Sequence, residues 1–159
     1  MRAVRAIRDV LEEEEPLGKP KIILLPFNPD MNPARESRVF CPPRLSRPAA
    51  ISQYRWWAPL DLDDQTSATD QALAIYSAAC DIYQDIIKHA AQLSDRWVLD
   101  TMNKEGFTFD VLRTPSGQIQ LIEINPFGAM SGCESCLRWI DDGRQLYGLE
   151  SEVELRYAV

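Results

Sequence analysis

The chain has 159 residues, enough for one domain with a sizeable core, and its 45% hydrophobic and 26% charged content excludes global disorder. Its net charge of −7 argues against a nucleic-acid-binding surface, which needs a basic stripe. No apolar run approaches the roughly 20 residues that span a bilayer, and the N-terminus lacks a signal-peptide pattern, so we expect a cytoplasmic protein that binds neither membranes nor nucleic acid.

The first part of the chain is predicted to form a helix, a buried strand and a strand pair. Residues 1–16 place apolar side chains on one helical face and end at a proline, which predicts an N-terminal helix. PKIILLPF at 20–27 is apolar after its lysine and predicts a strand buried on both faces. ESRVF at 36–40 and AAISQYRWW at 49–57 predict an antiparallel pair around a proline-rich loop.

One long helix is expected over residues 67–93. Apolar side chains recur there every three or four residues and form a single stripe of Leu73, Tyr76, Cys80, Tyr83, Ile87 and Ala90. His89, near its end, is expected to be a plain surface residue, because nothing nearby makes it a base. A shorter helix is expected over residues 95–105, stopped at Gly106.

The last third of the chain is predicted to contain a β-hairpin. FTFDVLR at 107–113 and QIQLIEIN at 118–125 flank a Thr-Pro-Ser-Gly turn, and a helix at about 132–147 and a strand in EVELRYAV follow. Together these elements predict one α+β domain over residues 1–159, with a largely antiparallel sheet and one long packed helix.

The hairpin is predicted to bring two carboxylates together. With Ser116-Gly117 in the turn, Asp110 lies directly across from Glu123, and Asn125 and Leu121 share their face because side chains alternate along a strand. The opposite face is apolar and is expected to point to the core: Phe107, Phe109, Val111, Ile122 and Ile124.

Like charges directly opposite one another destabilise a strand pair, so this arrangement needs an explanation. One carboxyl group is protonated, or a cation lies between the two. Carboxylate and amide oxygens suit a hard ion, magnesium above zinc. Alternatively, water screens the acids, or Arg38 or Arg113 pairs with them in a structural network. The spacing leaves both readings open.

The ordered set of motifs ESRVF, AISQYRWW, GFTFDVL and LIEINPFGAMSGC resembles the cell division cycle protein 123 family and related ATP-grasp proteins over residues 20–148. The resemblance implies an ATP-grasp-like fold and binding of ATP and Mg²⁺. It also implies a protein partner, because that family assists assembly of the eukaryotic translation initiation factor 2 complex.

Several site residues follow from this resemblance. Asp110, Glu123 and Asn125 match the magnesium ligands, and Arg38 matches an arginine that contacts phosphate, for which its planar, permanently charged fork is suited. The segment IILLPF matches the hinge that meets the adenine edge. The resemblance therefore also implies adenine contacts near Leu25 and Phe27.

The remaining motif residue and the departures are also informative. Gln53 in the Ile-Ser-Gln motif is interpreted as structural, and Ser37 stands where the family has phenylalanine. The family carries phosphate-binding lysines further upstream, whereas Lys19 and Lys21 stand too close to the hinge to replace them. We therefore expect the C-terminal portion of an ATP-grasp unit.

Three functions remain open from the sequence. The first is the nucleotide-dependent assembly role, the second an ATP-dependent carboxylate–amine ligase, and the third a truncated inactive fragment. Cys133 and Cys136 form a Cys-x-x-Cys pair that we interpret as packing residues, with a redox pair as the alternative. Trp56-Trp57 is either a contact surface or a core or cleft lining.

Overall fold

The computed structural model describes residues 29, 31–61, 67–129 and 136–158. This part of the chain is a mixed α+β fold with a five-stranded sheet in the order β4-β3-β1-β2-β5. The predicted α+β class is therefore confirmed. The helix predicted over residues 1–16 and the strand predicted over 20–27 lie outside the described residues.

The sheet is mostly antiparallel, as predicted. Its strands are β1 (Glu36–Cys41), β2 (Ala50–Gln53), β3 (Phe107–Arg113), β4 (Ile119–Pro126) and β5 (Glu154–Arg156). β1 pairs with β2 and with β3, and β3 pairs with β4, in antiparallel fashion. β5 pairs in parallel with β2, a pairing that the sequence pattern did not indicate. A short 3-10 helix, η1 (Pro33–Arg35), leads into β1.

The long helix α2 (Ala68–Gln92) begins after Ser67, whose hydroxyl accepts a hydrogen bond from the Asp70 amide. The buried side chains of α2 are Gln71, Ile75, Ala79, Tyr83, Ile86 and Ala90. The predicted stripe is thus wrong in part, because Leu73 is 60% exposed. Packing against the sheet selects a face rotated from the one that apolar spacing suggested. His89 is exposed, as predicted.

The shorter helix α3 (Trp97–Glu105) ends at Gly106, as expected. Gly106 has φ 75° and ψ 178°, a backbone region that is essentially restricted to glycine. A Cβ atom there would stand 2.7 Å from the Cys41 carbonyl oxygen and 2.9 Å from Pro43. The close approach lets β3 start directly against the end of β1.

Two predicted elements are shorter than expected. β2 stops at Gln53, where the side-chain Nε2 donates to the carbonyls of Arg55 and Ala58 and closes a turn. Gln53 Oε1 also accepts from the Ala158 amide, so the predicted structural role of Gln53 is confirmed. The turn leaves Trp56 and Trp57 48% and 61% exposed, which excludes a core role for them.

The helix predicted over residues 132–147 is also much shorter. Among the described residues of that range only α4 (Gly143–Leu146) is helical, and residues 136–142 form turns. Asp142 accepts a side-chain hydrogen bond from the Arg138 amide and ends this turn region just before α4. No helix in the described part of the chain is both long and apolar enough to cross a membrane.

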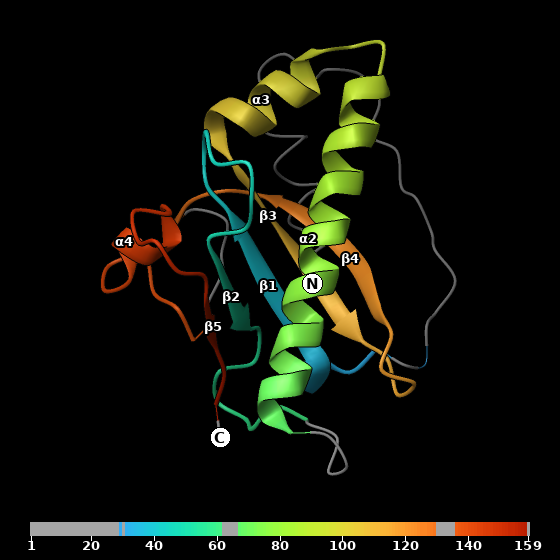
Figure 1. Cartoon of the computed structure of the whole chain (residues 1–159), viewed down its shortest axis with the longest axis vertical. Coiled ribbons are helices and arrows are strands. Elements are labelled where there is room, and N and C mark those ends of the chain that lie inside the picture. The colour runs from blue at the N-terminus through green and yellow to red at the C-terminus, as the bar shows by residue number, and fades with distance from the viewer. Residues whose placement is uncertain (1–28, 30, 62–66, 130–135, 159) are drawn as a thin grey trace, which may run out of the picture.

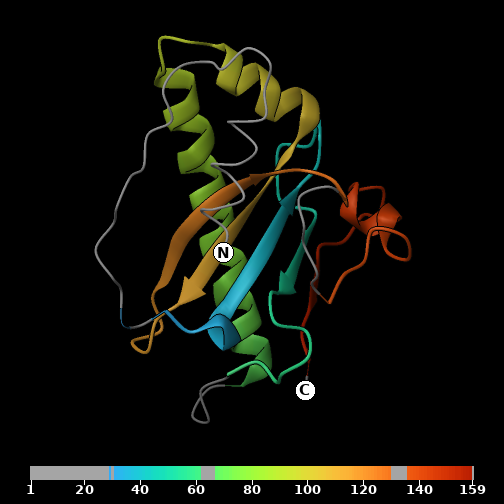
Figure 2. The same cartoon turned by 180° about the vertical axis from the view of Figure 1, so that it is seen from behind.

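Apolar side chains pack on both faces of the sheet. In Figure 1, α2 crosses one face, and the first core lies there, formed by side chains that include Val39, Ile51, Phe109 and Tyr83. Figure 2 shows the opposite face, with the α4 region beside the β5 edge. The second core on that face contains Phe40, Ala50, Leu137 and Leu146. The central strands are therefore covered on both sides.

Candidate functional site

Polar side chains form a row across the sheet on the face that points away from α2. The strand registers align Ser52 with Arg38, Arg38 with Asp110, and Asp110 with Glu123. Ser52 is also aligned with Arg156 of β5. Residues directly opposite one another point to the same face, so each of the five strands contributes one side chain to what we call the polar row.

Arg38 and Asp110 occupy the centre of the polar row. Arg38 Nε donates to Asp110 Oδ1 and Arg38 Nη2 donates to Oδ2, both at 2.6 Å. The two side chains are 3% and 0% exposed. A bidentate arginine–carboxylate pair is among the strongest hydrogen-bonded pairs in proteins, and here it offsets part of the cost of burying both charges. The sequence left open whether an arginine pairs with the acids, and the structure places Arg38 there.

Glu123 and Asn125 form the more accessible end of the site. Asp110 and Glu123 are directly aligned, as the hairpin predicted. Glu123 Oε1 accepts from Asn125 Nδ2 at 3.2 Å and lies 4.0 Å from Arg38 Nη2. The Glu123 side chain is 36% exposed, so solvent reaches the site from the β4 side. Arg38 thus lies close to both carboxylates, which relieves their mutual repulsion.

The electrostatic setting of Asp110 combines opposing effects. Burial raises the pKa of its carboxyl group above the ordinary value, the Arg38 guanidinium acts to lower that pKa, and the neighbouring Glu123 raises it again. The net direction is upward. A carboxylate whose pKa is raised gains more from an added positive charge than a solvated one does, because it is desolvated.

Two buried polar atoms of this face have no hydrogen-bond partner among the described residues, Arg38 Nη1 and Thr108 Oγ1. Thr108 is aligned with Asn125, and each lies two residues from the acid on its own strand, Asp110 or Glu123. The Tyr54 ring lies on the guanidinium, with its centroid 5.0 Å from Arg38 Cζ, a favourable cation–π contact. Arg38 is therefore held by Asp110 and Tyr54 while one of its donors stays unpaired.

This donor set fits a hard cation bound together with an anionic ligand. Asp110, Glu123 and Asn125 offer carboxylate and amide oxygens, which magnesium prefers. Arg38 Nη1 is a buried donor without an acceptor, and a phosphate oxygen is one group that could accept from it. Among the residues that the structure describes, no three His, Cys, Asp or Glu side chains cluster as a metal site, so water and phosphate would supply the other ligands.

A β-bulge changes the face on which Leu121 lies. The register shifts between Asp110 and Val111, so that Val111 is aligned with Leu121 rather than with Ile122. Leu121 therefore joins Ile124 in an apolar pocket of about 560 Å³ that α2 and α3 also line. The prediction that Leu121 shares the face of the acids is wrong, because one inserted residue reverses the alternation beyond it.

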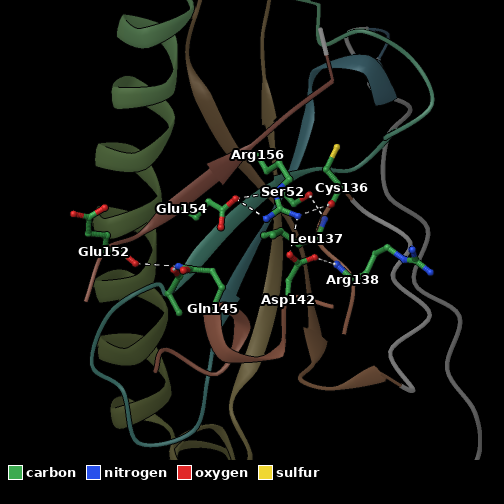
Figure 3. Close-up of polar contacts among 10 residues, drawn as sticks. Ser52, Cys136, Leu137, Arg138, Asp142, Gln145, Glu152, Glu154 and Arg156 are labelled. Atoms are coloured by element: carbon green, nitrogen blue, oxygen red, sulfur yellow. Dashed lines mark hydrogen bonds and ion pairs between the residues drawn. The ribbon is translucent and has the colours of Figure 1, made fainter. Parts of the chain in front are cut away.

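At the other end of the polar row, hydrogen bonds and an ion pair connect the C-terminal region to the sheet. Arg156 forms an ion pair with Asp142 at 2.8 Å and donates to the Cys136 carbonyl oxygen at 3.3 Å (Figure 3). The Leu137 amide donates to the Ser52 hydroxyl at 3.3 Å. These contacts satisfy polar groups between β2, β5 and the chain before α4, and we interpret them as structural.

The structure thus brings Arg38, Asp110, Glu123 and Asn125 together, as the sequence predicted, whereas Leu25 and Phe27 lie outside the described residues. Two neighbours of these residues had no predicted role, Tyr54 and Thr108. Tyr54 directly follows the Ile-Ser-Gln motif. Thr108 stands two residues before Asp110, so strand alternation predicts that it shares the face of the acids. Cys136 is half-buried, and Cys133 lies outside the described residues.

No protein-family model matches the chain, and the comparison with curated proteins finds no relative of it. The polar row and the resemblance of the motifs are therefore the features that point to a function.

Proposed function

We propose that this chain is a cytoplasmic, ATP-grasp-like protein that binds ATP together with magnesium. The observation that carries the proposal is the alignment of Arg38, Asp110 and Glu123 across three strands, with Arg38 Nη1 buried and unpaired. A site that holds two carboxylates and an arginine with a spare donor suits a metal–polyphosphate complex better than it suits either component alone.

Each residue has a distinct role in this proposal. Asp110, Glu123 and Asn125 hold the magnesium ion, and Arg38 binds a phosphate oxygen through Nη1. The ion supplies charge neutralisation for the phosphates. Glu123 and Asn125, which are more accessible than Asp110, are the residues that the ligand meets first. The resemblance adds adenine contacts near Leu25 and Phe27.

The resemblance also supports a protein partner. We propose that the nucleotide-bound chain assists assembly of a translation initiation factor 2 complex, as the cell division cycle protein 123 family does. The exposed pair Trp56-Trp57 and the acidic net charge are compatible with a protein surface as the target. Co-purification with initiation factor 2 subunits, lost when ATP is withdrawn, tests this role.

The nucleotide proposal is tested by calorimetric titration of the chain with ATP, with and without Mg²⁺. We expect binding that requires Mg²⁺ and that weakens on the order of tenfold or more in Glu123→Gln. Glu123 is the variant of choice because it is partly exposed, so its substitution leaves the buried Arg38–Asp110 pair intact. Glu150→Gln is the matched control, since Glu150 is exposed and pairs with Arg144 far from the site.

The outcomes separate the open functions. Binding of ATP that ignores Mg²⁺, or equal loss of affinity in Glu123→Gln and Glu150→Gln, contradicts the proposed site. No binding at millimolar ATP contradicts nucleotide binding altogether and leaves an inactive fragment. Release of ADP on addition of small amino and carboxylic acids indicates a ligase instead of an assembly factor.

A further inference from the structure

We infer that Arg38 makes the site selective for a metal–polyphosphate complex over a bare divalent cation, an inference that rests on the proposed function. Arg38 occupies both oxygens of Asp110 at 2.6 Å and lies 4.0 Å from Glu123 Oε1. Its single positive charge therefore already compensates one of the two carboxylates. The site is left with one net negative charge for an incoming ion.

A bare cation meets an unfavourable environment in this site. An ion that takes the Asp110 oxygens as ligands lies close to the guanidinium, and the two positive charges repel one another more strongly beside these buried side chains than they would in bulk water. The Tyr54 ring against Arg38 and the depth of its burial keep the guanidinium in place. Arg38 therefore opposes occupation by the cation alone.

A polyphosphate reverses this balance. Its oxygens accept a hydrogen bond from the unpaired Arg38 Nη1 and serve as ligands of the cation at the same time. Cation and polyphosphate thus strengthen each other's binding, and by linkage the effect is reciprocal. Arg38 acts here as a specificity-determining residue, because it weakens binding of the cation alone and strengthens binding of the polyphosphate.

The test measures Mn²⁺ binding by electron paramagnetic resonance at pH 8, with and without inorganic tripolyphosphate. We expect wild-type protein to bind Mn²⁺ at least about tenfold more weakly alone than with tripolyphosphate. In Arg38→Met, Mn²⁺ alone is expected to bind at least about tenfold more tightly than in wild type, while tripolyphosphate binding weakens. Arg38→Lys keeps the charge and is expected to bind Mn²⁺ alone as wild type does.

The changes of opposite sign distinguish this inference from a structural role, since a misfolded variant loses both ligands. Equal Mn²⁺ affinity in wild-type protein with and without tripolyphosphate overturns the inference, and this measurement needs no variant. Tighter binding of Mn²⁺ alone by Arg38→Lys than by wild type also overturns it, as does unchanged affinity in Arg38→Met. In each of these cases magnesium-dependent ATP binding still upholds the proposed function. If wild-type protein binds neither Mn²⁺ nor tripolyphosphate, the proposed function fails together with the inference.

Discussion

At the scale of single residues, the Arg38–Asp110 pair decides the character of the site. The pair connects β1 and β3 through two hydrogen bonds in a buried position, so each charge compensates the other where solvent does not. Replacing both residues by apolar ones of similar volume is often neutral, whereas removing one partner leaves a buried charge without compensation. The presence of the pair is by itself therefore weak evidence that it stabilises the fold.

Asp110→Asn is expected to destabilise the protein by about 3–5 kcal/mol, because it leaves the Arg38 charge buried and unpaired. Asp61→Asn is the matched control. Asp61 pairs with Arg35 at 2.7 Å, but their side chains are 40% and 24% exposed, so the expected loss is about 1 kcal/mol or less. Urea unfolding of both variants measures the difference. Equal losses of stability in the two variants contradict the expectation that removing Asp110 leaves a buried, uncompensated charge.

The Cys41 thiol gives a test at alkaline pH. Burial raises the pKa of this thiol well above its ordinary value of 9.0, so the unfolded chain ionises first as pH rises. Its contribution to stability is therefore complete below pH 9.0 and is lost as pH rises toward the pKa of the folded state, by at most about 1.4 kcal/mol per pH unit.

Urea unfolding at pH 8 and pH 10 measures this loss, and Cys41→Ala is expected to reduce it. Burial also raises the pKa of Tyr83 from 10.0, so part of the decline persists in the variant. An equally steep decline in wild type and Cys41→Ala contradicts the assignment to Cys41.

At the scale of elements, two local devices hold the site strands in register. Gly106 lets β3 begin against the end of β1. The Gln53 side chain donates through Nε2 at the end of β2 and accepts through Oε1 from the Ala158 amide. Both act on the ends of strands that carry the polar row, so they position Arg38 and Asp110 without touching them.

Gly106→Ala is expected to cost at least about 1 kcal/mol more than Gly117→Ala. Both glycines have positive φ, 75° and 83°, which alanine adopts only with strain. An added Cβ at Gly106 would stand 2.7 Å from the Cys41 carbonyl oxygen, whereas at Gly117 nothing lies within 4 Å. Thermal unfolding of the two variants compares them, and equal melting temperatures contradict the close approach.

Gln53→Met is expected to destabilise the protein by about 2–4 kcal/mol, because three partly buried hydrogen bonds to backbone groups are lost at similar side-chain volume. Gln118→Met, at an exposed position, is expected to change stability by about 0.5 kcal/mol or less. Urea midpoints distinguish the two. A near-neutral Gln53→Met shows that Gln53 does not hold this turn.

At the scale of the whole molecule, the two faces of the sheet are covered by different elements and to different extents. α2 and α3 pack on one face, and the C-terminal region covers the apolar end of the other face, beside the polar row. The central strands β1 and β3 have buried side chains along almost their whole length, whereas the side chains of β4 are half-buried or exposed.

Native-state hydrogen exchange is expected to follow this arrangement. The amides of β1 and β3 are expected to exchange most slowly, near the global unfolding rate, and those of β4 and β5 faster, since these strands stand at the ends of the sheet order. Mass spectrometry of peptides after deuterium labelling provides the measurement. Slower exchange in β4 than in β1 contradicts this order of local stabilities.

The sequence by itself determined where the two longer helices and the strands of the hairpin lie and which acids meet, whereas it overestimated the length of β2 and of the helix around α4. A Ser-Gly turn between alternating strands sets the register locally, so Asp110 and Glu123 were predictable as partners. The N-cap at Ser67 and the stop at Gly106 are likewise local signals. Each of these features depends on residues that are close together in the chain. Short turns and helix ends allow few backbone conformations, so local sequence is enough to predict them.

Only the tertiary structure decided what surrounds those acids. The contact between Arg38 and Asp110 joins residues 72 positions apart, and no local rule specifies that β1 lies beside β3. The bulge at Val111, the rotated face of α2 and the parallel pairing of β5 also arise from packing between distant segments. Packing between these distant segments selected one of several arrangements that the sequence pattern left equivalent. That arrangement places one guanidinium beside two opposed carboxylates and so compensates one of their two charges.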